Sequence, residues 1–306
     1  MATGRQGGPG DPARGAVYPA GARQAPGRSA PVSDFFIAQL SDLHIKAGGK
    51  LSYRRVDTLS ALQRAVATLN QLSPRPDVVV ITGDLVDFGR AEEYATLKQA
   101  LADLLMPFYL MPGNHDERNA LRAAFEDHDY LRQQPEFVQW VIDDYPVRLI
   151  GLDSTVPGQP HGELCQPRLD WLDATLRQQP QRPTVVMLHH PPFDSGISHM
   201  DRQKLRNDDA LARVIERHPQ VERVLCGHLH RSIQRRFAGT LACVCPGSSH
   251  QVALDLRPNA PSQFMLEPPA FLLHHWSEAG GMVTHTGAIG RYDGPYPFFD
   301  EHGLID

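Results

Sequence analysis

Five short segments of the chain end in side chains that bind metals or transfer protons, and each segment follows an apolar run typical of a strand. They are Asp42-Leu43-His44, Gly83-Asp84-Leu85-Val86-Asp87, Gly113-Asn114-His115-Asp116, His189-His190-Pro191-Pro192 and Gly227-His228-Leu229-His230. Together they offer enough nitrogen and oxygen ligands for two adjacent divalent ions. Two ions held side by side are suited to the hydrolysis of phosphate esters.

Asp84 is the predicted bridge between the two ions, because a carboxylate has two oxygens. It follows a valine-rich run through Gly83, and glycine permits the sharp turn or close backbone approach that aims the next side chain at a site. Asp87 is predicted to cap a helix or to support a ligand rather than to bind an ion itself.

Two pairs of candidate ligands are separated by one residue: Asp42 with His44, and His228 with His230. Residues at this spacing point the same way on an extended chain, so each pair could hold one ion. His189 and His190 are direct neighbours and would point to opposite sides of such a chain. We therefore expect only one of these two to bind a metal.

The three residues Asn114, His115 and Asp116 are predicted to have different roles. The carbonyl oxygen of Asn114 is a neutral ligand suited to a divalent ion. His115 could face the substrate instead, where it would stabilise charge on the phosphoryl oxygens or protonate a leaving group. Asp116 would either orient His115 or cap the helix that follows.

The elements that position these segments alternate between strands and helices. Strands are predicted at residues 35–40, 77–82, 107–111, 184–189 and 221–226, and helices after Asp57 and at residues 91–105, 167–177 and 207–217. Residues 136–143 and 147–153 are predicted to pair as antiparallel strands, and residues 271–276 and 281–286 to form a hairpin. This order predicts a layered α/β fold, in which ligands bind beyond the carboxyl ends of the strands.

Composition narrows the class of protein. The chain has 306 residues, 41% of them hydrophobic, and a net charge of −5, which disfavours a nucleic-acid polymer as partner. Four cysteines are too few for a disulfide scaffold. No apolar run approaches the length of a membrane span, and residues 1–33 are predicted to be a disordered leader without an export signal, so a cytoplasmic location without membrane association is expected.

Residues 34–250 would form the catalytic domain and residues 251–306 a cap or oligomerisation segment.

The ordered set of five segments resembles the calcineurin-like metallophosphoesterases, and within them the bacterial class III cyclic-nucleotide phosphodiesterases and glycerophosphodiesterases. Leu40–His44, Arg90–Tyr94, His189–Phe193 and Gly247–Gln251 carry the narrower similarity. The resemblance implies a four-layer αββα sandwich and a homo-oligomer. It also implies two divalent ions (iron, manganese, zinc or cobalt), one bound by Asp42, His44, Asp84 and His230, the other by Asp84, Asn114, His189 and His228.

By the same resemblance, His115 would face the substrate and His161 could contact it; an exposed loop histidine is the alternative for His161. The expected reaction is hydrolysis of a small phosphodiester, such as a cyclic nucleotide or a glycerophosphodiester, by water activated at the two ions. The alternatives are a phosphomonoesterase or a nucleotide or lipid pyrophosphatase at the same site. A non-catalytic metal-bearing scaffold is disfavoured, because such a protein should lack ligands and this chain has the whole set.

Overall fold

Two β-sheets lie face to face and carry helices on their outer sides. The structure, a computed structural model, describes residues 34–305, so the predicted leader at residues 1–33 lies outside the described residues. The first sheet contains, in sheet order, β13 (Gly281–Ala288), β12 (Ala270–Ser277), β1 (Phe35–Leu40), β2 (Val78–Thr82) and β3 (Phe108–Met111). The second contains β4 (Trp140–Ile142), β5 (Arg148–Gly151), β6 (Thr184–Met187), β7 (Val221–Cys226), β9 (Thr240–Val244) and β8 (Ile233–Phe237).

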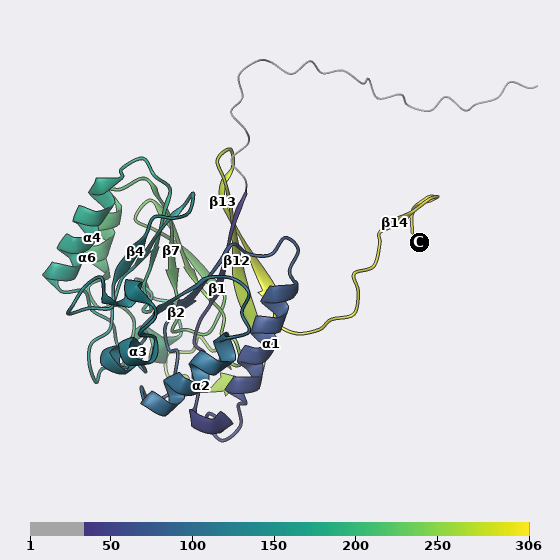
Figure 1. Ribbon diagram of the computed structural model, residues 1–306, viewed down its shortest axis with the longest axis horizontal. Coiled ribbons are helices and arrows are strands. Elements are labelled where there is room, and N and C mark those ends of the chain that lie inside the picture. Colours follow the sequence, from purple (N-terminus) through teal and green to yellow (C-terminus); the bar gives the residue numbers. More distant parts are fainter. Residues whose placement is uncertain (1–33, 306) are drawn as a thin grey trace, which may run out of the picture. The chain divides into compact units, whose positions relative to one another are not determined.

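Helices cover the outer face of each sheet (Figure 1). The helices α1 (Thr58–Gln71), α2 (Ala91–Leu101) and α3 (Arg118–Ala124) follow the strands of the first sheet, and α4 (Gln166–Gln178), α5 (Ser198–Asp201) and α6 (Asp208–Ile215) those of the second. Short 3-10 helices span Ala47–Gly49 and Asp129–Arg132. Two small ladders complete the described chain, β10 (Gln251–Val252) with β11 (Phe264–Met265) and β14 (Phe299–Asp300) with β15 (Gly303–Leu304).

Alternating residues of the second sheet belong to different cores, which establishes four layers. Leu149 and Met187 pack in the core shared with the first sheet, α1 and α2. Ile150 and Val186, their neighbours along the same strands, pack instead against α4 and α6. Because successive side chains of a strand point to opposite faces, the sheet is buried on both sides. The predicted αββα sandwich is therefore the observed fold.

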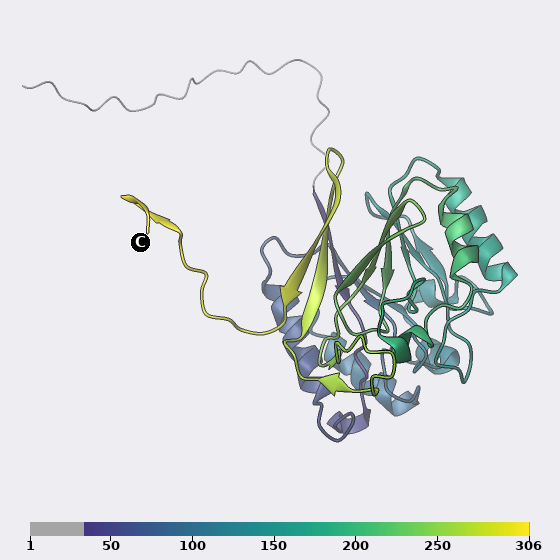
Figure 2. The same cartoon turned by 180° about the vertical axis from the view of Figure 1, so that it is seen from behind.

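The predicted hairpin near the C-terminus forms and joins the first sheet (Figure 2). β12 pairs antiparallel with β1, in a register that sets Phe35 opposite Trp276. Phe271 and Trp276 point to opposite faces of β12, and both are buried in the core around the first sheet. The first sheet thus continues past residue 250, where the sequence predicts a separate cap, and β13 forms its edge. Pairing of that edge with a second copy stays a prediction.

Local signals explain where the first two helices begin and end. The Asp57 carboxylate accepts a hydrogen bond from Ser60 N at 3.0 Å, so the predicted N-cap of α1 is confirmed. α2 ends at Leu101, four residues before the predicted end. Asn70 explains the difference, because its side-chain amide pairs with Asp103 O and Leu105 N and so satisfies backbone groups outside the helix. Among the helices of residues 34–305, none combines the length and apolarity needed to cross a membrane.

Candidate metal centre

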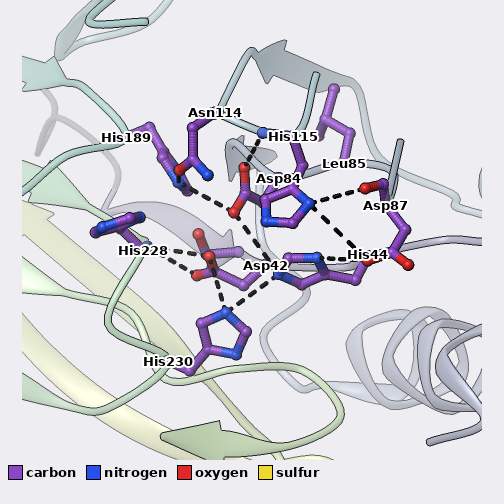
Figure 3. Close-up of polar contacts among 12 residues, drawn as sticks. Asp42, His44, Asp84, Leu85, Asp87, Asn114, His115, His189, His228 and His230 are labelled. Carbon is purple, nitrogen blue, oxygen red and sulfur yellow. Dashed lines mark hydrogen bonds and ion pairs between the residues drawn. The ribbon is translucent and has the colours of Figure 1, made fainter. Parts of the chain in front are cut away.

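The five segments lie just beyond the carboxyl ends of β1, β2, β3, β6 and β7, as the alternation of elements predicts. Three of these strands belong to the first sheet and two to the second. Their side chains converge on one cluster, which Figure 3 shows with its polar contacts. Side chains that are up to 188 residues apart along the chain therefore share one buried site.

Asp84 lies at the centre of the cluster. Its Oδ2 is 3.3 Å from His189 Nε2 on one side and 3.6 Å from His44 Nε2 on the other. Its Oδ1 accepts a hydrogen bond from His115 N at 2.9 Å. One carboxylate thus contacts imidazoles of both halves of the fold, which is the position required of a bridging ligand.

The first half of the cluster joins Asp42, His44 and His230. His44 Nε2 and His230 Nε2 are 3.2 Å apart, and Asp42 Oδ1 is 3.4 Å from His230 Nε2. All three side chains are buried. One ligand atom from each lies within 4.8 Å of the others, so the three together could hold an ion.

The second half joins Asn114, His189 and His228. Asn114 Oδ1 lies 3.2 Å from His189 Nε2. The rings of His189 and His228 have centroids 5.1 Å apart, and His190 lies with them as a third close ring. A second ion could therefore be held beside the first, with Asp84 between them.

The separations between these donors fit a coordination shell. Donors bound at about 2.1 Å in tetrahedral or octahedral arrangement lie roughly 3.0–3.4 Å from one another. The contacts around Asp84, His44 and His189 span 3.2 to 3.6 Å. Nitrogen atoms of two imidazoles that approach to 3.2 Å in a buried site are well explained by a shared cation.

The backbone at the candidate ligands is not extended, so the reasoning from extended spacing does not hold. Asp42, His44, Asp84, His228 and His230 all have φ between +46° and +71°. L-residues seldom adopt these angles, and such strain gathers at functional sites. Asp42 and His44 both lie in the cluster, as predicted from their spacing. The backbone that carries them turns at each residue instead of continuing as a strand.

Two glycines admit the close approach of the loops. A Cβ on Gly113 would overlap the Asp84 side chain, and a Cβ on Gly83 would overlap the His189 ring. Gly83 also has a φ of +94°. The predicted use of Gly83 for a turn or a close backbone approach is therefore confirmed, since this residue shows both.

In three candidate ligands, the ring nitrogen that faces away from the cluster, Nδ1, lies close to an oxygen atom. Asp87 Oδ1 lies 3.3 Å from His44 Nδ1, Thr82 O lies 2.8 Å from His189 Nδ1, and His250 O lies 3.3 Å from His230 Nδ1. Such partners fix the orientation and tautomer of a metal-binding histidine. Asp87 thus takes the predicted supporting role. His250 is not among the predicted site residues, although it lies in the segment Gly247–Gln251 that carries part of the resemblance.

Asp116 has neither of its two predicted roles. Its carboxylate accepts hydrogen bonds from Gly113 N at 2.8 Å, Leu85 N at 3.0 Å and Val86 N at 3.3 Å. Tyr94 OH donates a further bond at 2.9 Å. Asp116 therefore joins the two loops that carry Asp84 and Asn114. The cap of α3 is Glu117, the next residue.

His115 stands at the open side of the cluster. Its Nδ1 is 2.8 Å from the Asp87 carbonyl oxygen, to which it donates, and its ring packs edge-on against His44 at 4.7 Å between centroids. About a third of its side chain is exposed (34%), whereas the His44 and His189 side chains are buried. Within residues 34–305 no hydrogen bond occupies its Nε2, so this nitrogen could meet a substrate, and contact of His115 with a substrate stays a prediction.

His161 is buried, at 4% exposure, so the alternative of an exposed loop histidine is wrong. Its neighbour Gly162 packs against the ring of His190, because a Cβ there would overlap that ring. The loop of His161 therefore closes over the second half of the cluster. Contact of His161 with a substrate stays a prediction.

Burial and charge give the cluster the protonation that metal binding needs. Burial lowers the pKa of His228 and of His230 to about 3, so both rings are neutral near pH 7. Burial alone would raise the pKa of Asp84, but the imidazoles of His189 and His115 hold it well below its usual range. Metals bind neutral imidazole and ionised carboxylate, so these groups are ready as ligands.

His189 shows that the site attracts positive charge. Burial alone would lower the pKa of His189, yet the carboxylates of Asp84 and Asp42 raise it to about 9. A proton on His189 would then offset the two buried carboxylates. A divalent ion could supply the same compensation and displace that proton.

A family model for calcineurin-like phosphoesterases matches residues 36–232, about two thirds of the chain. The chain belongs to this family. Calcineurin-like phosphoesterases use a binuclear divalent metal centre, in agreement with the clusters of histidine and aspartate around Asp84. The resemblance stated from the five segments is thereby confirmed.

Several members of the family are similar over most of their length. A protein named probable glycerophosphodiester phosphodiesterase GpdQ, from Arcobacter nitrofigilis, is 42% identical over 88% of this chain and 99% of its own. The 3',5'-cyclic adenosine monophosphate phosphodiesterase CpdA of Escherichia coli K12 is 31% identical over 70% of this chain and 76% of its own. A dimetal phosphatase from Danio rerio shares the fold, with a TM-score of 0.56 over 85% of this chain and all of its own at 16% identity.

Proposed function

We propose that this protein hydrolyses small phosphodiesters at two adjacent divalent ions. The observation that carries the proposal is the position of Asp84, whose Oδ2 contacts His44 and His189 from opposite sides. The names of the similar proteins, which include glycerophosphodiester and cyclic-nucleotide phosphodiesterases, support diesters as the substrate class. Acidic net charge favours small substrates over nucleic-acid polymers.

We assign the ligands as two sets that share Asp84. Asp42, His44, Asp84 and His230 would hold one ion, and Asp84, Asn114, His189 and His228 the other. Mixed nitrogen and oxygen donors suit iron, manganese, zinc or cobalt, and this donor set does not select one of them. When bound, the ions would lower the pKa of a water and neutralise charge on the phosphoryl oxygens.

The chain's own residues supply the rest of the mechanism. Asp84 and the neutral imidazoles of His228 and His230 would hold the ions, and thereby determine where the phosphoryl group can bind. Asn114 contributes its side-chain carbonyl oxygen beside His189. His115 would point Nε2 at the leaving oxygen, since Nδ1 is held by the Asp87 carbonyl. Asp116 keeps the loops of Asp84 and His115 in register through the three backbone N–H groups it binds.

Chelation should abolish turnover of a diester. We expect the purified protein to cleave bis(p-nitrophenyl) phosphate, to lose activity in EDTA, and to recover it when Mn²⁺ or Zn²⁺ is returned. The monoester p-nitrophenyl phosphate is the comparison that separates the phosphomonoesterase alternative. Undiminished diester cleavage by protein shown to be metal-free would contradict the proposal, and faster cleavage of the monoester would favour the alternative.

Tyr53, Phe264 and His250 form an aromatic rim beside the metal cluster, which could select among diesters. Tyr53 is about half exposed (49%) and has a φ of +49°, and its ring lies 5.1 Å from Phe264 and 5.4 Å from His250. His250 in turn packs 4.6 Å from His230, so the rim adjoins the metal cluster. Burial, with the nearby carboxylates of Asp87 and Asp84, raises the pKa of Tyr53 to about 12, so its ring is an uncharged surface.

Replacement of Tyr53 by alanine should therefore lower kcat/KM for substrates that contain an aromatic ring or a nucleobase more than for substrates without one. A stacking contact of about 1 kcal/mol predicts a fall of about five-fold in kcat/KM for a cyclic nucleotide or an aryl diester. A glycerophosphodiester without a ring should change less than two-fold. The control is Tyr53→Phe, which keeps the ring and should keep the wild-type ratio. Equal losses on both substrate classes would exclude a stacking role for this residue.

A further inference from the structure

One of the four histidines assigned to the ions lacks the support that the other three have. His189 and His230 each have a carbonyl oxygen within 3.3 Å of the nitrogen that faces away from the cluster. The Asp87 carboxylate lies 3.3 Å from the corresponding nitrogen of His44, as an ion pair without hydrogen-bond geometry. His228 Nε2 is buried and makes no hydrogen bond to any part of residues 34–305. Histidines that bind metals almost always donate their second N–H to an acceptor, so this nitrogen calls for a partner.

The neighbour of this nitrogen is His190, which the metal site does not otherwise use. The two rings have centroids 4.9 Å apart and planes inclined by 52°. One nitrogen from each of His189, His190 and His228 lies within 4.8 Å of the others. His190 is fully buried, and its Nε2 also lacks a hydrogen-bond partner among the described residues. Two unsatisfied nitrogens therefore lie in adjacent, buried rings.

Ser154 contacts the opposite edge of the His190 ring, with its Oγ 2.8 Å from Nδ1. A proton on Nδ1 that is donated to this hydroxyl oxygen leaves Nε2 with a free lone pair. Gly162 packs on the ring and closes it from solvent, because a side chain there would overlap it.

We propose that His190 is a positioning residue for the metal centre: its Nε2 accepts the N–H of His228 Nε2 through one bridging water. This bond would fix the His228 tautomer so that Nδ1 is the nitrogen offered to the ion. Ser154 would hold His190 in the orientation this requires. The inference rests on the proposed function, since it concerns the ion assigned to His189 and His228.

Three variants separate this role from simple packing. His190→Phe keeps a ring in the buried site and removes both nitrogens. His190→Gln places an amide near the position of Nε2 and can restore an acceptor. Ser154→Ala leaves His190 in place but removes the hydroxyl at its Nδ1. Circular dichroism and thermal melting of the metal-free proteins show whether each variant is folded.

Metal binding to the metal-free proteins is the measurement, by titration calorimetry with Mn²⁺ and by the visible spectrum with Co²⁺. We expect one of the two binding steps to weaken 10- to 100-fold in His190→Phe, the usual effect of losing such a partner, while the other changes less than about two-fold. His190→Gln should recover part of the loss. Ser154→Ala should weaken the same step by a smaller factor, and it decides the matter if His190→Phe does not fold.

Each contrary outcome has a distinct meaning. A folded His190→Phe that binds both ions as the wild type does would overturn the positioning role. Equal weakening of both steps without recovery in His190→Gln would also overturn it, since that is the result of disturbed packing. A wild-type protein that binds two ions but cleaves no phosphodiester would sink the proposed function and leave this inference standing.

Discussion

Replacement of Asp84 by alanine should lower kcat/KM for a diester by at least on the order of 10³-fold. The reason is that this one carboxylate contacts imidazoles of both ligand sets, at 3.3 Å for His189 and 3.6 Å for His44. Its loss would leave Asp42 as the one carboxylate among the assigned ligands, and the ion assigned to Asn114, His189 and His228 would have none. Metal analysis should accompany the kinetics, and we expect fewer than two ions per chain.

Two controls separate catalysis from folding in this experiment. Asp84→Asn keeps the shape and the bond from His115 N but removes the negative charge, so it should lose nearly as much activity as the alanine variant. Asp173→Asn changes another buried carboxylate, one that contacts His218 at 2.9 Å on the outer side of the second sheet. Its activity should stay near that of the wild type. Folded Asp84 variants with two ions and full activity would contradict the bridging role.

The order of elements and the location of the site could be predicted because both depend on local signals. The predicted strands at residues 35–40 and 221–226 coincide with β1 and β7. A strand followed by a helix dictates that the next strand runs parallel, so the polar segments meet at one edge of each sheet. Local pattern therefore sufficed to bring Asp42, Asp84 and Asn114 together.

The orientation of individual side chains could not be predicted, because it depends on backbone angles that composition does not reveal. Reasoning from extended chain expects His189 and His190 on opposite sides, yet both rings lie within 5.1 Å of the His228 ring. β6 ends at Met187, so neither histidine belongs to a strand. The positive φ of Asp42 and of His228 likewise follows from tertiary packing and not from residue type.

Contacts between distant segments explain the remaining differences. β12 pairs with β1 across more than 230 residues, and no local pattern shows which strand will cover the edge of β1. His250 reaches the cluster from the loop after β9, and Asp116 binds backbone groups of the preceding strand's loop. In both cases the partner is a backbone atom, and backbone atoms leave no trace in the sequence.

Replacement of His115 by alanine should affect substrates according to their leaving groups. If His115 Nε2 protonates the departing oxygen, cleavage of a glycerophosphodiester should fall by about 10²- to 10⁴-fold, because an alkoxide departs poorly without a proton. Bis(p-nitrophenyl) phosphate should lose much less, since p-nitrophenolate departs readily as an anion. His285→Ala, which removes an exposed histidine on β13, is the control and should change neither rate. An equal fall on both substrates would show instead that His115 acts on the phosphoryl oxygens, whose charge both reactions share.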